Sequence, residues 1–130
     1  MDFPPRTLTL LSQTLAICRL NPSDGVPAWP IASRFLAITR TPNEISIVCY
    51  QQLVPPGVTY EPNWRALETA GPMDFKLTGV LVSLLTPLAQ AGISVFAIST
   101  FDTDYLLVKQ ESLPAAILAL ESAGHTILQH

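Results

Sequence analysis

The sequence has few charged residues, and basic residues are especially sparse. Only 13% of its 130 residues are charged, with seven Lys and Arg against ten Asp and Glu and a formal net charge of −3. The basic residues are scattered and form no run. Because nucleic-acid binding usually leaves a basic footprint, we expect no nucleic-acid partner. The apolar fraction of 48% also excludes a disordered chain.

Cysteine and histidine are equally scarce. Cys18 and Cys49 are the only cysteines, each lies in an apolar segment, and no CxxC motif or Cys/His cluster is present. We therefore expect two buried reduced thiols, no metal site and no cofactor. His125 and His130 have no arrangement with Ser, Cys or Asp that suggests catalysis.

A long uninterrupted apolar run is absent as well. The longest apolar stretch, residues 77–98, is broken by Pro87, Gln90 and Gly92, so we expect no membrane span. The first ten residues, MDFPPRTLTL, lack the pattern of a secretory signal. These features predict a cytoplasmic protein.

Proline-rich segments divide what remains. Pro55, Pro56 and Pro62, together with Gly57, separate the chain near residue 60. The first half has short runs typical of strands at 15–20, 35–40 and 44–50, the last two joined by the turn residues Thr-Pro-Asn.

The second half predicts alternating strands and helices. Residues 64–70 suit a strand or a helix, and Pro87 predicts a kink or a lost hydrogen bond in the helix that follows. Because a helix must cross one face of the sheet between strands that form no tight hairpin, the pattern predicts an α+β, ferredoxin-like βαββαβ unit. The expected elements are a helix at 77–91 ending at Gly92, strands at 93–100 and 104–109, a helix at 112–123 ending at Gly124, and a strand at 125–128.

Residues 71–108 read GPMDFKLTGVLVSLLTPLAQAGISVFAISTFDTDYLLV and resemble the amino-acid-binding ACT domain. The motifs GPxDFxLTGxL, LAxAGISVFxxST and xTDYxLV carry the resemblance, which points to small bacterial tandem-ACT proteins related to the eukaryotic cytosolic arginine sensor. LAICRL and FLAITRTPNEISIVC are similar to the degenerate N-terminal half of these proteins. The resemblance implies tandem ferredoxin-like ACT units with an antiparallel sheet and helices on one face. It divides the chain into a degenerate ACT-like half, 1–60, and a C-terminal ACT domain, 61–130.

The resemblance also implies a ligand, usually a free amino acid, at the interface between paired ACT units. Gly79 matches a glycine that lets ligand and backbone approach closely. Thr100 and Phe101 match the loop that wraps the ligand, and Asp104 matches the acidic residue that holds its charged nitrogen. Because this chain has two ACT-like halves where the arginine sensor has four, we expect a homodimer.

The chemistry of an amino acid adds two candidates. Asp102, like Asp104, could bind an ammonium group by charge-assisted hydrogen bonds. The ligand carboxylate suits the start of the helix near residue 77, where Thr78 would supply a hydroxyl. The alternatives are that Asp102 accepts backbone bonds within a turn and that Phe101 belongs to the core.

Three classes of function follow. The first is an amino-acid-binding regulatory or sensor protein without catalysis, and the second is an ACT-fold assembly module without a ligand. The third, a small acylphosphatase-type enzyme, requires an anion-binding Arg in a glycine-rich loop near the first strand. It is disfavoured because the arginines of the first half lie in no such loop: Arg6, Arg19, Arg34 and Arg40.

Overall fold

The chain folds into two compact units, one of which is inserted in the sequence of the other. The computed structural model describes residues 4–70 and 79–129. The unit that we call the outer unit combines Met1–Ser12 with Arg65–His130, and the inserted unit is Gln13–Trp64. The expected halves, 1–60 and 61–130, have a single boundary, whereas the compact units also separate after residue 12.

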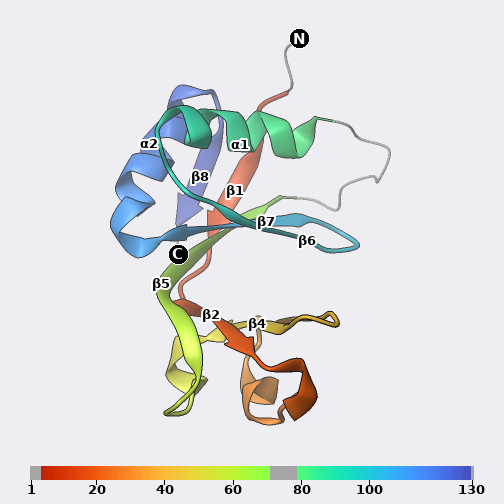
Figure 1. Cartoon of the computed structure of the whole chain (residues 1–130). Helices are drawn as coiled ribbons and strands as arrows, with labels where there is room; N and C mark the ends of the chain where they lie inside the picture. Colours follow the sequence, from red (N-terminus) through yellow and green to blue (C-terminus); the bar gives the residue numbers. More distant parts are fainter. Residues whose placement is uncertain (1–3, 71–78, 130) are drawn as a thin grey trace. The chain divides into compact units, whose positions relative to one another are not determined.

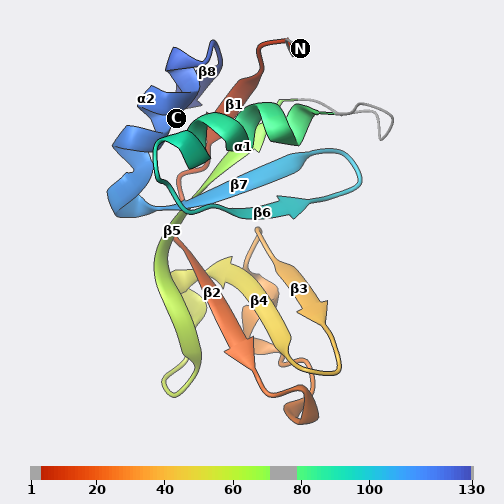
Figure 2. The same ribbon diagram turned by 45° about the horizontal axis from the view of Figure 1, so that its top comes forward.

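The outer unit contains the predicted βαββαβ succession. Both helices lie on one face of its sheet (Figures 1 and 2), which confirms the α+β, ferredoxin-like class. Residues 64–69, open between strand and helix in the sequence, belong to a strand. The elements are the C-terminal part of β5 (Thr59–Thr69), α1 (Val80–Gln90), β6 (Phe96–Ser99), β7 (Asp104–Lys109), α2 (Leu113–Ser122) and β8 (Thr126–Gln129).

An additional strand from the N-terminus, β1 (Thr7–Leu10), completes this sheet. The hydrogen-bonding order is β6-β7-β5-β1-β8. Leu8 pairs with Thr69 of antiparallel β5 and with Ile127 of parallel β8. In an uninterrupted ferredoxin-like unit the last strand would pair with the first; here β1 lies between them. This strand was not predicted from the sequence.

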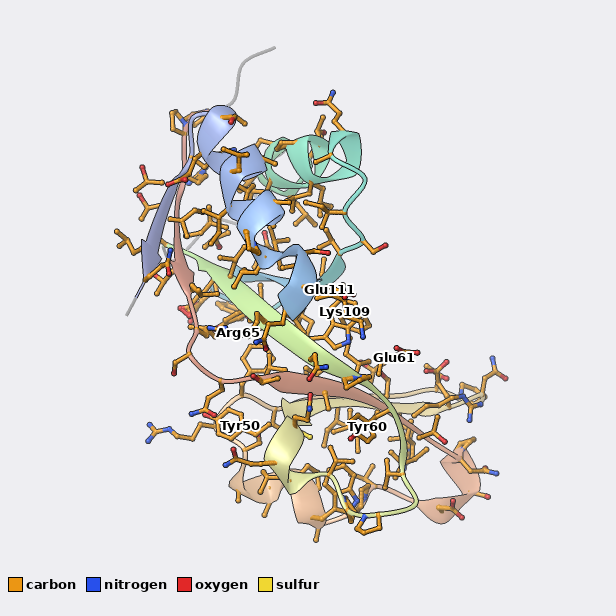
Figure 3. All side chains as sticks on the ribbon, turned by 90° about the vertical axis from the view of Figure 1, so that its left-hand side faces the viewer. Tyr50, Tyr60, Glu61, Arg65, Lys109 and Glu111 are labelled. Carbon is orange, nitrogen blue, oxygen red and sulfur yellow. The ribbon has the colours of Figure 1, made fainter. Side chains whose placement is uncertain are left out.

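The contact between β1 and β5 continues past the end of β1. The Leu11 N–H donates to the Ala66 carbonyl at 2.9 Å. Arg65, labelled on β5 in Figure 3, donates an Nη2–H to the Leu11 carbonyl at 3.0 Å. One guanidinium nitrogen is therefore bonded within the sheet, whereas the buried Nε of Arg65 has no hydrogen-bond partner among the described residues.

The core of the outer unit explains why α1 forms where it does. Val80, Leu84 and Leu88 recur at a spacing of four and are buried against the sheet. The helix ends in a Schellman motif, since Gly92, at φ 75°, donates its N–H to Ala89 and Ile93 donates to Leu88. The remaining members of the buried cluster come from three strands and α2: Leu8, Leu10, Leu67, Leu106, Val108, Ala116 and Leu120.

The other predicted helix end is also confirmed. The backbone N–H of Gly124, which has φ 99°, donates to the Glu121 carbonyl, and the backbone N–H of His125 donates to the Leu120 carbonyl. This is the same motif at the end of α2.

The inserted unit is β-rich, as the sequence predicts. Its strands β2 (Leu15–Leu20), β3 (Ala37–Arg40), β4 (Ile45–Tyr50) and the first part of β5 pair in the order β3-β4-β2-β5. The Thr41 N–H donates to the Glu44 carbonyl at 2.9 Å and closes the predicted β3–β4 turn. Short 3-10 turns, rather than α-helices, connect the other strands among these described residues: Pro22–Asp24, Trp29–Ala32 and Gln51–Leu53.

Cys18 and Cys49 are buried in the core of the inserted unit, as expected for structural thiols. They lie diagonally across β2 and β4, because Cys18 is paired with Ile47 and Cys49 with Ala16. A hydrogen bond to Cys49, together with burial, raises the pKa of the Cys18 thiol.

Candidate ligand site

The expected site residues gather at one end of the outer unit. The first turn of α1 and the turn between β6 and β7 lie at the same end of the helix-covered sheet (Figures 1 and 2). Thr100, Phe101, Asp102 and Asp104 belong to the turn and to the start of β7. Gly79 precedes α1, and Thr78 lies outside the described residues.

Thr100 closes the β6–β7 turn. Its N–H donates to the Thr103 carbonyl at 2.8 Å, and its hydroxyl donates to the same oxygen at 3.1 Å. The Thr103 N–H donates back to Thr100 Oγ1 at 3.3 Å. Phe101 and Asp102 occupy the two central positions, where Phe101 is 79% exposed. The structure thus excludes a core position for Phe101 in this chain.

Asp104 lies on the face of the sheet that the helices cover. Alternation along β7 places it on the same side as Leu106 and Val108, which belong to the buried core. The residue is only 8% exposed. Ser99 donates its hydroxyl to Asp104 Oδ1 at 2.5 Å, so the carboxylate has a defined orientation.

Thr69 and Thr103 join the end of β5 to the start of β7. Their hydroxyl oxygens are 2.5 Å apart, and Thr103 Oγ1 donates to the Thr69 carbonyl at 2.8 Å. The Asp104 N–H donates to Thr69 Oγ1 at 3.2 Å. Thr69 is 2% exposed, so its hydrogen bonds are shielded from solvent.

Asp102 acts on a different group from Asp104. The Tyr105 side chain is on the opposite face of β7, where Ile98 is its cross-strand partner. Burial raises the pKa of Tyr105, and the charge of Glu68, its hydrogen bond to the phenol and the charge of Asp102 raise it further. The two aspartates therefore have separate electrostatic neighbours.

Gly79 is the N-cap residue of α1 and has φ 81°. This left-handed conformation is strained for residues with a Cβ, which gives a physical reason for glycine that the sequence analysis did not consider. Its carbonyl accepts the first helical bond, from Ser83 at 2.9 Å. Among the described residues, no side chain caps the start of α1. Its first N–H groups therefore have no partner within the helix.

The structure adds Ser99, Thr69 and Thr103 to the residues expected around Asp104. Ser99 could have been found from the sequence, because a four-residue turn pairs it with Asp104 across the hairpin. Thr69 carries no such local signal, since it reaches Asp104 from a strand 35 residues away.

The described ranges contain neither a cluster of side chains suited to a metal ion nor a membrane-spanning helix. No group of three or more His, Cys, Asp or Glu side chains in residues 4–70 and 79–129 could hold a metal ion. None of the helices in these ranges is both long and apolar enough to cross a membrane.

Sequence profiles match both parts of the chain. The profile of the ACT domain matches residues 59–122. A second profile, which describes an N-terminal domain, matches residues 13–57. The boundary between the two matches falls in the Pro-rich segment before β5.

Two human proteins are similar in sequence. The cytosolic arginine sensor for mTORC1 subunit 1 is 28% identical over 127 residues, which cover 90% of this chain and 39% of the sensor. The putative protein CASTOR3P is 30% identical over 102 residues, or 68% of this chain and 63% of that protein. The chain thus spans less than two thirds of either relative.

Solved structures share the fold. A crystal structure of a protein from Agobacterium tumefaciens has a TM-score of 0.93 and 38% identity, covering 98% of this chain and 96% of that protein. The regulatory subunit of aspartate kinase from Thermus thermophilus, in its ligand-free form, has a TM-score of 0.61 and 13% identity, covering 90% and 96% of the two chains. The second likeness concerns the fold alone. Together with the sequence match over residues 59–122, the βαββαβ outer unit shows that the chain belongs to the ACT-domain family.

Proposed function

We propose that this protein binds a free amino acid reversibly and acts as a regulatory sensor, without catalysing a reaction. The observation that carries the proposal is the Asp104 carboxylate, which is buried yet bonded to the neutral hydroxyl of Ser99 among the described residues. A buried carboxylate is costly unless a cationic group compensates it. The ammonium or guanidinium group of an amino acid would supply that compensation through charge-assisted hydrogen bonds.

The start of α1 complements Asp104. An amino acid also carries a carboxylate, and the uncapped N–H groups and dipole of a helix N-terminus favour an anion. Gly79 presents no Cβ at this point. In the proposed site the ligand carboxylate therefore lies near Gly79, while its cationic group meets Asp104. Thr78, Thr100, Phe101 and Asp102 are the further proposed contacts.

We place this site at an interface between ACT units of two copies of the chain. The helices of the outer unit support a homodimer, because α1 has no charged residue and α2 has one, Glu121. Val82 of α1 is 57% exposed and Leu118 of α2 is 67% exposed. These same side chains favour the second candidate function, an assembly module that pairs without a ligand.

Arginine is the first ligand to test, since relatives at low identity are named as arginine sensors. A thermal-shift screen of the twenty amino acids, with light scattering on the same samples, separates the two functions. A ligand at 100 times its Kd adds about 2.7 kcal/mol to stability and raises the Tm by several degrees. A dimer whose Tm no amino acid changes at millimolar concentration would support assembly instead.

The site assignment is tested by Asp104→Asn, which keeps the shape of the side chain and removes its charge. We expect the affinity for the amino acid to fall by about ten- to a hundredfold, because a charge-assisted bond is lost. Asp24→Asn is the matched control, since it removes the same charge from an exposed residue of the inserted unit that is not part of the proposed site. Calorimetric titration of both variants gives the comparison. Equal affinities for wild type and Asp104→Asn would refute this site.

A further inference from the structure

We propose that Ser99 and Thr69 are positioning residues, which set the orientation and place of Asp104 and thereby the affinity for the cationic group of the ligand. This inference rests on the proposed amino-acid function. Neither residue was among those expected from the sequence or implied by the ACT resemblance. Ser99 acts on the side chain of Asp104, and Thr69 acts on its backbone.

Ser99 orients the carboxylate of Asp104. Ser99 and Asp104 are the last cross-strand pair before the turn, so their side chains share the helix-covered face. A serine hydroxyl has one proton, and Ser99 uses it on Asp104 Oδ1. The bond fixes the rotamer of the carboxylate, and no described residue supplies a cationic partner that would compensate its negative charge. A ligand cation then meets a carboxylate that is already oriented, which lowers the entropic cost of binding.

The hydroxyl groups of Thr69 and Thr103 hold the backbone at Asp104. The Thr103 hydroxyl gives its proton to the Thr69 carbonyl, so it must accept at the 2.5 Å contact between the two hydroxyls. The Thr69 hydroxyl proton has two acceptors within reach, Thr103 Oγ1 at 2.5 Å and the Asp104 carbonyl at 3.2 Å, and Thr69 Oγ1 accepts the Asp104 N–H. Each hydroxyl thus donates once, and the chain of bonds fixes the backbone of Asp104 against the end of β5.

The neighbours of Thr69 and Asp104 on the same face are apolar. Leu67 precedes Thr69 on β5, and Leu106 and Val108 follow Asp104 on β7; all three are fully buried and apolar. Valine would fill the volume of Thr69 in such a core without needing hydrogen bonds. Hydroxyl side chains replace apolar ones where Asp104, the only carboxylate on this face among the described residues, lies. Ser99 bonds the side chain of Asp104, and Thr69 bonds its backbone.

The test is a double-mutant cycle measured by calorimetric titration with L-arginine, or with another of the twenty amino acids if that one gives the largest shift in the screen. Ser99→Ala should weaken binding about tenfold, and Ser99→Thr, which keeps the hydroxyl, should restore it. In the Asp104→Asn background, Ser99→Ala should have no further effect, because Ser99 acts through the carboxylate. Equal losses in both backgrounds, or no loss in either, would overturn the role of Ser99.

Thr69 is tested in the same way with two variants. Thr69→Val keeps the shape and removes the hydroxyl, and Thr69→Ser keeps the hydroxyl; only the former should lose about tenfold in affinity. Similar losses in both variants would show that packing alone matters. If no amino acid binds the wild type, the proposed function itself fails, and the inference fails with it. A wild type that binds normally while these variants also bind normally overturns the inference only.

Discussion

At the residue scale, two aspartates separated by one residue have different surroundings. In a continuous strand Asp102 and Asp104 would share a face, because side chains alternate with a period of two. The strand begins only at Asp104, however, so the turn breaks the alternation. Asp104 is held in the hydroxyl network, whereas Asp102 contributes to the electrostatic environment of Tyr105. The family resemblance named Asp104 alone, and Asp102 was left open between a ligand contact and a turn residue; the turn geometry gives the physical reason why their surroundings differ.

The raised pKa of Tyr105, to which Asp102 contributes, predicts how the stability of the protein depends on pH. Its pKa is raised in the folded state, so below pH 10 it is neutral in both states and the stability is fully present. Above pH 10 the unfolded chain releases the proton first, and stability is lost until the pH passes the folded pKa. Urea unfolding at pH 8 and pH 10.5 should show a larger loss for wild type than for Tyr105→Phe. Parallel losses in the two proteins would contradict the assignment.

At the element scale, the sequence predicted elements whose signals are local. Strands at 15–20 and 104–109 have the predicted boundaries, and both glycine helix ends are confirmed. The helix expected at 112–123 begins at Leu113, because Ser112 has helical dihedral angles but makes no side-chain capping bond and belongs to the 3-10 turn that leads into α2. The four-residue strand β1 was missed because its partners lie more than 50 residues away.

The predicted effect of Pro87 on α1 is visible in its hydrogen bonds. Proline has no N–H to donate to Ser83, four residues earlier. His125 Nε2 lies 3.2 Å from that carbonyl, and His125 Nδ1 accepts the Arg6 N–H at 3.0 Å. The accepting Nδ1 requires the proton on Nε2, which then donates to Ser83. A buried histidine thus replaces the helical donor and links α1 to the segment before β1.

This replacement predicts coupling between His125 and Pro87. His125→Phe leaves the Arg6 N–H and the Ser83 carbonyl unpaired and should cost about 2–3 kcal/mol of unfolding free energy. In the Pro87→Ala background the helix supplies its own donor, so the same substitution should cost about 1 kcal/mol less. Urea unfolding of the four proteins, followed by circular dichroism, measures this difference. Equal costs in the two backgrounds would rule out the replacement.

At the scale of the whole molecule, the insertion of one unit into the other is the feature that sequence reasoning could least anticipate. Composition shifts and prolines mark breaks along the chain, but they do not show which distant segments pair. The Pro-rich segment near residue 60 suggested one boundary, yet Leu8 and Leu10 of β1 belong to the core of the unit that resumes at Arg65. The ACT profile itself begins at residue 59 and does not include β1.

The position of β1 predicts which unit a mutation near the N-terminus destabilises. Leu8 is fully buried in the core of the outer unit, so Leu8→Ala should cost about 2–5 kcal/mol there. Both α-helices of the described chain belong to the outer unit, whereas Trp29 and Trp64 belong to the inserted unit. Helical circular dichroism and tryptophan fluorescence therefore report on different units in one urea titration.

We expect Leu8→Ala to lower the urea midpoint of the helical signal more than that of the fluorescence signal. Thr9→Ala is the matched control, because Thr9 is the next residue on β1 and faces the opposite side of the sheet. If residues 1–60 instead fold as one domain, Leu8→Ala should lower the fluorescence midpoint more than the helical midpoint. Trp29 would then share a domain with Leu8, and Trp64 would border that domain. A larger shift in the helical signal would show that the first strand of the chain stabilises the ACT unit formed by its last 66 residues.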